Sequence, residues 1–256
     1  MPNSIQAWSA ALAVFAASGA PGAFAADACV AQSGAKVVPL VELYTSEGCS
    51  SCPPADRWLS RQLSNRNANW LAFHVDYWDA IGWPDRFASP QYTQRQNERV
   101  RLAGDRTVYT PQVMVGRDVR IAWNSPMTFS RALKTAAGAD AGVSLKLRLD
   151  ASKVRLDVAR TGAATAPATV WLVRYVDAQT SRVRAGENRG ATLRHDRVVR
   201  QLWGPWQLGA APAAQVETLM ALSGTWGLVA FVEDGSGRTL QSLALPAGDC
   251  AAVASR

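Results

Sequence analysis

Two cysteines three positions apart, Cys49 and Cys52, constrain the fold of this chain more than any other feature of its sequence. They directly follow a short apolar strand predicted over residues 37–45, and a helix predicted over residues 52–63 begins at the second cysteine. The unpaired amides and positive end of a helix stabilise a thiolate on the first cysteine of such a pair. Cys52 is then placed to attack a mixed disulfide formed at Cys49 and to release the product.

The first half of the chain alternates between strand and helix patterns. After the helix at residues 52–63, a strand is predicted over 70–78 and a helix from Ser89-Pro90 to about residue 103. Two strands follow over 111–115 and 119–123, and a helix over 125–138 ends the series. The order predicts an α/β domain (β-α-β-α-β-β-α) over residues 36–139, with parallel strands first and an antiparallel pair last.

The pattern changes after Asp140, where apolar residues alternate with polar ones. Alternation of this kind is typical of antiparallel strands that bury one face. It predicts an antiparallel β-sandwich-like domain over residues 140–250. The predicted strands cover residues 143–149, 154–158, 169–176, 197–203, 226–233 and 239–245.

The segment around the cysteines resembles the active sites of glutaredoxins and thioredoxins. Tyr44-Thr45 is followed by Gly48-Cys49-x-x-Cys52, and the element order of residues 36–139 is that of their core. The resemblance implies a Thr-Pro at the start of the third strand, with a cis peptide bond lying against the dithiol. Thr110-Pro111 stands at that place, so Pro111 is expected to shape the substrate site and Thr110 to line it.

A closer resemblance is to an uncharacterised family of secreted bacterial thioredoxin-like proteins, known only as a domain of unknown function. The segments E-L-Y-T-S-E-G-C-S-S-C-P-P-A-D, H-V-D-Y-W-D, G-W-x-D-x-F and T-P-Q carry it over most of the chain. The chain departs from working thioredoxins in the Ser50-Ser51 pair between the cysteines, so no redox potential is carried over.

Aromatic side chains are dense after the second predicted strand. The carboxyl ends of parallel strands meet at one edge of a sheet, where ligands bind. Tyr77, Trp78 and Trp83 are therefore candidates to wall a groove for a peptide or a partner's unfolded chain. The other interpretation is that they only cap the core of a small domain.

Three ionisable residues are candidates for a proton relay. His74 and Asp76 share a face of the predicted strand, because residues two apart point the same way. Glu42 lies on the strand before the dithiol, and the resemblance to thioredoxins implies a buried carboxylate that accepts the proton of Cys52. The alternatives are a satisfied core histidine and a solvated glutamate.

The first 25 residues hold no charged side chain and include an apolar segment too short to span a bilayer. They predict a signal peptide over residues 1–25 and a periplasmic or secreted protein, with no membrane span after cleavage. In an oxidising compartment Cys29 and Cys250 are expected to form a disulfide that ties the two ends together. A lipid-modified Cys29 is the rival interpretation.

The charge pattern and the possible metal ligands define the alternatives to a redox function. The net charge of +7 is spread over scattered arginines, so no nucleic-acid partner is expected. Cys49 and Cys52 with His74 form a possible copper(I) set, and His195 a further zinc ligand. An inert structural disulfide is the third possibility. The sequence favours thiol-disulfide exchange with protein thiols or disulfides of the periplasm, without cofactor or metal.

Overall fold

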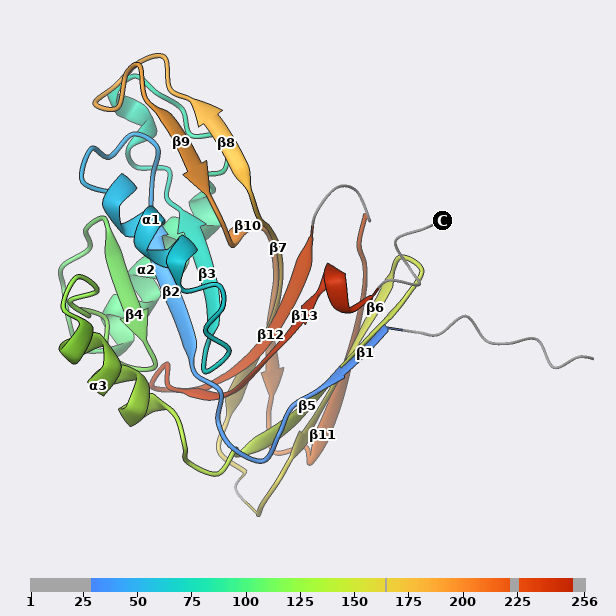
Figure 1. The fold of residues 1–256 in the computed structure, drawn as a ribbon. Helices are drawn as coiled ribbons and strands as arrows, with labels where there is room; N and C mark the ends of the chain where they lie inside the picture. Colours follow the sequence, from blue (N-terminus) through green and yellow to red (C-terminus); the bar gives the residue numbers. More distant parts are fainter. Residues whose placement is uncertain (1–28, 164, 222–225, 251–256) are drawn as a thin grey trace, which may run out of the picture.

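The computed structural model describes residues 29–163, 165–221 and 226–250, and these form an α/β protein made mostly of β-sheet (Figure 1). The predicted signal peptide lies outside the described residues. A seven-stranded sheet has the order β13-β12-β7-β10-β3-β2-β4. Its strands are β2 (Leu40–Thr45), β3 (Asn69–His74), β4 (Gln112–Val115), β7 (Ala168–Val176), β10 (Val198–Leu208), β12 (Gly227–Asp234) and β13 (Thr239–Pro246).

Three helices cover the β3-β2-β4 end of this sheet: α1 (Pro53–Arg61), α2 (Pro90–Leu102) and α3 (Pro126–Ala136). Each begins with a proline, which lacks the amide donor that a first turn leaves unpaired anyway. The hydroxyls of Ser89 and Ser125 accept hydrogen bonds from the amides of Gln91 and Thr128, which fixes the starts of α2 and α3.

The side chains of β2 alternate between two apolar layers. Val41 and Leu43 pack with α1 and α3, whereas Leu40 and Tyr44 face α2 on the other side of the sheet. The strand is therefore buried on both faces, as expected for a strand between helices. Strand β3 runs parallel to β2 and β4 runs antiparallel to it.

A second sheet packs on the other end of the seven-stranded sheet and makes a β-sandwich. Its order is β1-β5-β6-β11, with β1 (Cys29–Gln32), β5 (Val143–Asp150), β6 (Lys153–Arg160) and β11 (Ala213–Leu219). The alternating residues Leu145, Leu147 and Leu156 meet Leu172 and Ala230 in one apolar layer.

One sheet joins the segments on either side of residue 140. Val198 of β10 pairs with Ala72 of β3 in parallel, and the Ala72 amide donates to the carbonyl of Arg197 at 2.9 Å. A separate hairpin of β8 (Gln179–Arg182) and β9 (Thr192–His195) extends from the β7 and β10 strands toward α1 (Figure 1).

Several elements differ from the sequence prediction. Residues 119–123 form no strand: Val115 and Asp118 make an isolated bridge and the Ile121 amide bonds the Val113 carbonyl, but no continuous ladder follows. The predicted strand at 70–78 ends at His74. Strands β1, β8, β9 and β11 were not predicted, because they are short or carry exposed polar side chains. Within the described ranges no helix is long and apolar enough to cross a membrane.

Candidate functional site

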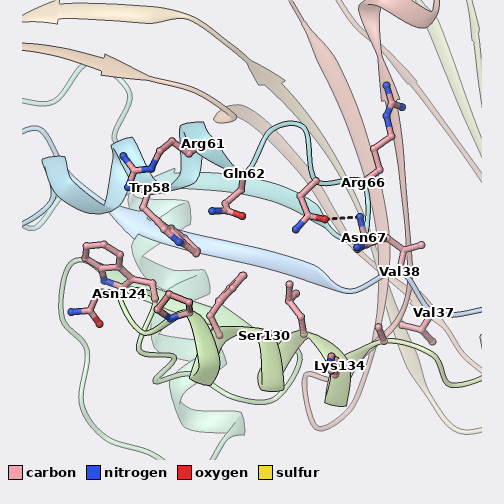
Figure 2. A pocket seen from close by; sticks show the side chains of 16 residues that line it. Val37, Val38, Trp58, Arg61, Gln62, Arg66, Asn67, Asn124, Ser130 and Lys134 are labelled. Carbon is pink, nitrogen blue, oxygen red and sulfur yellow. Dashed lines mark hydrogen bonds between the residues drawn. The ribbon is translucent and has the colours of Figure 1, made fainter.

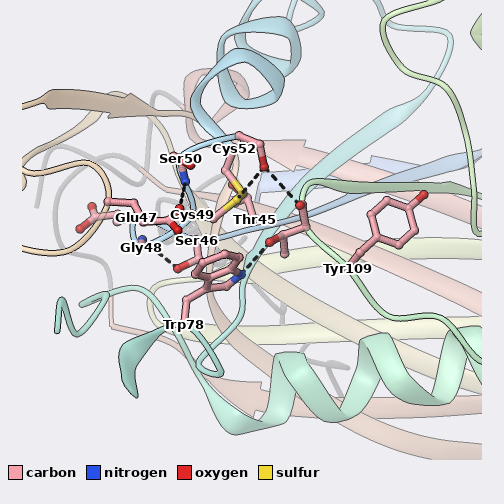
Figure 3. The surroundings of a disulfide bond; sticks show 12 residues. Thr45, Ser46, Glu47, Gly48, Cys49, Ser50, Cys52, Trp78 and Tyr109 are labelled. Atoms are coloured by element: carbon pink, nitrogen blue, oxygen red, sulfur yellow. Dashed lines mark hydrogen bonds between the residues drawn. A yellow bond between two sulfur atoms is a disulfide. The ribbon is translucent and has the colours of Figure 1, made fainter. Parts of the chain in front are cut away.

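Cys49 and Cys52 form a disulfide between the end of β2 and the start of α1 (Figure 3). Their Cα atoms are 5.4 Å apart, and Cys52 is the residue that caps the amino-terminal end of α1. Both cysteines are 0% exposed. The sulfur atoms therefore lie at the positive end of a helix, but beneath the surface of the protein.

The segment before β4 lies beside the disulfide. The peptide bond between Thr110 and Pro111 is cis, and the Thr110 carbonyl accepts a hydrogen bond from Ser51 Oγ at 3.4 Å. The Ser51 hydroxyl is also 3.3 Å from Cys49 Sγ. Trp78 Nε1 donates to Thr110 Oγ1 at 2.7 Å, so the Trp78 ring is held against this segment (Figure 3).

The loop 186–190, between β8 and β9, contacts the backbone of the cysteine loop. Asn188 Nδ2 donates to the carbonyls of Glu47 and Cys49 at 2.8 and 2.9 Å. The Ser50 amide donates to Glu187 Oε2 at 2.9 Å. Gly186 has a φ of +70°, and a Cβ there would come within 3.2 Å of Trp83 Cβ. We call residues 186–190 the cap loop.

A buried histidine with two carboxylates lies under the cysteine loop. His195, at the end of β9, places Nε2 3.3 Å from Glu47 Oε1 and Nδ1 3.4 Å from Asp56 Oδ2. Burial alone would lower the pKa of His195, but Asp56 and Glu47 outweigh it and raise the pKa to about 10. His195 is therefore a cation at neutral pH, held between two acids on opposite sides of its ring.

Asp56 connects this histidine to the disulfide-bearing helix. It lies one turn beyond Cys52, and its amide donates to the Cys52 carbonyl at 3.1 Å. Asp56 Oδ1 accepts a hydrogen bond of 2.8 Å from Thr45 Oγ1 at the end of β2. The Asp56 carboxylate thus contacts both Thr45 at the end of β2 and His195 at the end of β9. It therefore connects the cysteine loop to the second half of the chain.

A second histidine-carboxylate pair packs against the first. His74 Nδ1 is 2.6 Å from Asp85 Oδ2, and the rings of His74 and His195 lie 4.9 Å apart. Asp85 also accepts a hydrogen bond from the Glu47 amide at 2.9 Å. Burial would raise the pKa of Asp85, but His74 and the backbone donors lower it to about 2. We call Glu47, Asp56, His74, Asp85 and His195 the histidine-acid cluster.

The sequence-predicted proton relay is arranged differently. His74 bonds Asp85 and not Asp76, because β3 ends at His74 and the alternation of faces ends with it. Asp76 instead accepts a hydrogen bond from the hydroxyl of Thr93 on α2.

Glu42 takes no part in the cysteine site. It contacts Arg95 and Arg99 of α2, since its position on β2 faces α2 and not α1. Burial would raise the pKa of Glu42, but the two guanidinium groups hold it below its usual value. Glu233 of β12 completes this buried ion network through the same two arginines.

The predicted aromatic candidates separate into two groups. Trp78 and Trp83 are half-buried next to the cysteine loop, and Trp83 Nε1 donates to Glu47 Oε2 at 2.8 Å. Tyr77 is 39% exposed, and its hydroxyl bonds Gln96 on α2 at 3.3 Å. The two tryptophans therefore fix the cysteine site, whereas Tyr77 lies on the surface over α2.

The remaining cysteines, Cys29 and Cys250, are bonded to each other with their Cα atoms 5.2 Å apart. This bond joins β1 to the residue after the short 3-10 helix η2 (Ala247–Asp249). Since Cys29 Sγ is in a disulfide, the lipid-modified interpretation of Cys29 does not describe this structure.

Three contributors to the site were not singled out from the sequence: Glu47, Asp56 and Asp85. The chain has only two histidines, and both lie in one buried cluster. That scarcity is the one sequence signal that could have directed attention to His195 as a partner of the cysteine loop. Across the residues that the structure describes, no three His, Cys, Asp or Glu side chains are grouped as metal ligands.

Fold and site together define an α/β protein in which a buried disulfide at a helix start rests on a cluster of buried acids and histidines. The chain belongs to the family described as "Protein of unknown function (DUF1223)", which matches residues 40–233. It matches no curated protein.

Two solved structures are similar in fold. One is the crystal structure of protein AGR_C_4864 from Agrobacterium tumefaciens, with 25% sequence identity and a TM-score of 0.61, covering 82% of this chain and 94% of that one. The other is HBP35 of Porphyromonas gingivalis, with 15% identity and a TM-score of 0.61, covering 82% of this chain and 74% of that one. The second likeness concerns the fold alone.

Proposed function

We propose that this protein is an exported, thioredoxin-like oxidoreductase that exchanges the Cys49-Cys52 disulfide with protein thiols or disulfides. The observation that carries the proposal is the position of this disulfide, at the start of α1 and beside the cis peptide bond of Thr110-Pro111. The order β2-α1-β3-α2-β4-α3, with β4 antiparallel to β2, also fits a thioredoxin-like core. The missing ladder at residues 119–123 is a departure from it.

The proposed exchange transfers two electrons and two protons. A thiolate of a partner dithiol attacks Cys49 Sγ, the Cys49-Cys52 bond breaks, and Cys52 Sγ leaves as a thiolate and takes up a proton. The second partner thiol then loses its proton and attacks the partner's own sulfur in the mixed disulfide. Cys49 leaves as a thiolate and takes up a proton, and the partner ends as a disulfide; the reverse sequence reduces a partner disulfide.

We assign the histidine-acid cluster a supporting role in this exchange. Glu47 lies two residues before Cys49, and the Asp56 amide donates a hydrogen bond to the Cys52 carbonyl. His195 is the cation between these two acids. A buried cation stabilises a neighbouring thiolate, and buried carboxylates destabilise it. The acids on either side of His195 limit this effect, so the thiol pKa values depend on all three groups.

Burial of both sulfur atoms requires a local opening before exchange. Cys49 and Cys52 are 0% exposed, and the cap loop and Trp78 are the parts that touch the cysteine loop from outside. A thiolate must approach along the line of the disulfide bond, so in this proposal the cap loop or Trp78 moves before Cys49 is attacked. The described state is therefore the closed, oxidised form in this proposal.

Export is part of the proposal and has two supports. Residues 1–25 have the composition of a signal peptide, and all four cysteines are paired in disulfides. Disulfides persist in oxidising compartments such as the bacterial periplasm.

Trapping is the experiment that tests the exchange. Cys52→Ser removes the resolving thiol, so mixed disulfides at Cys49 should accumulate with periplasmic proteins and appear on non-reducing gels. The double variant Cys29→Ser/Cys250→Ser keeps Cys52 and is the matched control, which should trap nothing. The absence of adducts from Cys52→Ser, in protein that still folds, would reject the exchange function.

A second candidate is a structural disulfide in a protein-interaction module without turnover, and the complete burial of the sulfur atoms favours it. Measurement of the reduction potential of the Cys49-Cys52 pair against glutathione separates the two. A potential below about −300 mV is typical of structural disulfides, whereas exchange proteins lie between roughly −270 and −120 mV.

A further inference from the structure

A groove runs between α1 and α3 on the face of the molecule that these helices cover (Figure 2). Its volume is about 900 Å³, within the range of small-molecule sites. The walls come from the second half of α1, the turn after it, the segment before α3, and α3 itself. It lies at the far end of α1 from Cys52 and shares no residue with the cysteine site.

The floor of the groove is aromatic. The ring of Trp58 on α1 lies 4.9 Å from that of Phe129 on α3 and 5.9 Å from that of Trp123, measured between centroids. Trp58 and Phe129 are 8% and 7% exposed, whereas Trp123 is half-buried. The rings are held by edge-to-face and tilted packing, so the floor is a preformed apolar surface.

The rim of the groove is cationic. Arg61, Arg66 and Lys134 line it, and no Asp or Glu is among the lining residues. None of the three forms an ion pair with a side chain in the described part of the chain, in contrast to Arg95 and Arg99. Unpaired cations around an apolar floor give the groove a charge that only an anion complements.

We propose that this groove binds a small organic anion that has an apolar body, such as a single acyl chain ending in a carboxylate or phosphate. The apolar body lies on the Trp58, Trp123 and Phe129 rings, and the anionic end contacts Arg61, Arg66 or Lys134. The amides of Gln62 and Asn124 at the rim supply neutral hydrogen bonds. The proposal commits to a free molecule and not to a membrane surface, because the floor lies recessed between two helices.

Calorimetric titration with decyl phosphate, below its micelle concentration, tests the proposal. We expect saturable binding with one molecule per chain. Decyltrimethylammonium, which has the same chain and the opposite charge, should bind at least tenfold more weakly, and inorganic phosphate should not bind measurably. Equal binding of the cationic amphiphile, or binding of phosphate alone, would overturn the proposal.

Two variants locate the site without disturbing the core. Arg61→Gln/Arg66→Gln/Lys134→Gln should weaken decyl phosphate binding by roughly tenfold or more, because each exposed charge contact contributes a few-fold. Ser130→Trp, at an exposed lining position, should fill the groove and abolish binding. The control Arg106→Gln/Arg117→Gln removes exposed cations that lie outside the groove and should leave binding unchanged.

The result is independent of the proposed redox function. Cys49→Ser/Cys52→Ser should bind decyl phosphate as the unaltered protein does. Binding retained in both the triple variant and Ser130→Trp would place the ligand elsewhere and reject the groove. Binding to vesicles of anionic phospholipid without binding to free decyl phosphate would replace the small molecule with a membrane surface and reject the proposal.

Discussion

At the scale of single residues, His195 is the group with the largest consequence for pH dependence. Its pKa rises from an ordinary value of 6.5 to about 10 in the folded protein, since Asp56 and Glu47 outweigh burial. A raised pKa means that the folded state binds the proton more tightly than the unfolded state. The stabilisation is fully present below pH 6.5 and is lost as the pH rises toward 10.

We therefore expect the free energy of unfolding to fall between pH 6.5 and pH 10, by on the order of 5 kcal/mol if His195 acts alone. Asp56→Asn removes one carboxylate beside the ring, so the decline should still begin near pH 6.5 but should be smaller and end at lower pH. Urea unfolding at a series of pH values measures this. An unfolding free energy that stays flat over this range would show that His195 is not a buried cation.

The ion network on the other face of the sheet gives a second prediction at this scale. Arg95→Met leaves the two buried carboxylates of Glu42 and Glu233 with Arg99 as their one remaining guanidinium partner, which should destabilise the protein by about 3 to 5 kcal/mol. The exposed pair of Arg101 and Glu98 on the same helix is the control, and Arg101→Met should change the unfolding free energy very little. Similar losses in both variants would contradict this account.

At the scale of elements, local signals in the sequence were sufficient to predict most of the fold. The serine caps at Ser89 and Ser125, and the alternation in β5 and β6, act within a few residues and are visible in the sequence. The contact between the cap loop and the cysteine loop has no such local signal. The cap loop reaches Cys49 through Asn188, which is 139 positions away, so only the path of the β8-β9 hairpin brings the two together.

The cap loop is the element whose motion controls access to the disulfide in the proposed function. Asn188→Ala removes the donor to two carbonyls of the cysteine loop, and each lost hydrogen bond is worth about 1 kcal/mol. We expect reduction of the Cys49-Cys52 bond by dithiothreitol to become roughly ten to thirty times faster.

Asn97→Ala is the matched control, because Asn97 bonds only a carbonyl of its own helix and is exposed. Its rate of disulfide reduction should equal that of the unaltered protein. An unchanged rate in Asn188→Ala would mean that the cap loop does not limit access, and that the opening occurs at Trp78 or elsewhere.

At the scale of the whole molecule, the two parts that the sequence distinguishes share one sheet. The pairing of β10 with β3 and the ion network from β2 to β12 both cross residue 140. Neither contact is visible in the sequence. The strands of the sandwich and the strands between helices have different residue patterns, so the sequence indicates two separate units even though their strands hydrogen bond to each other. His195 belongs to the same class of contact, since β9 places it under a cysteine loop of the first half.

The Cys29-Cys250 disulfide closes this arrangement, and its removal gives a test at the same scale. The two cysteines are 221 positions apart, so the bond restricts nearly the whole unfolded chain. The loop-entropy relation assigns such a bond about 5 kcal/mol of stability. Cys29→Ser/Cys250→Ser should therefore lower the free energy of unfolding by about that amount in denaturant titration.

The second disulfide of the chain is the internal comparison for that measurement. Cys49 and Cys52 are only three positions apart, so their bond restricts very little of the unfolded chain. Cys49→Ser/Cys52→Ser should cost much less stability than the loss of the Cys29-Cys250 bond. Equal losses of stability in the two double variants would show that the Cys29-Cys250 bond does not act by restricting the unfolded chain. The pairing of β1 with β5 would then hold the end of the chain without the disulfide.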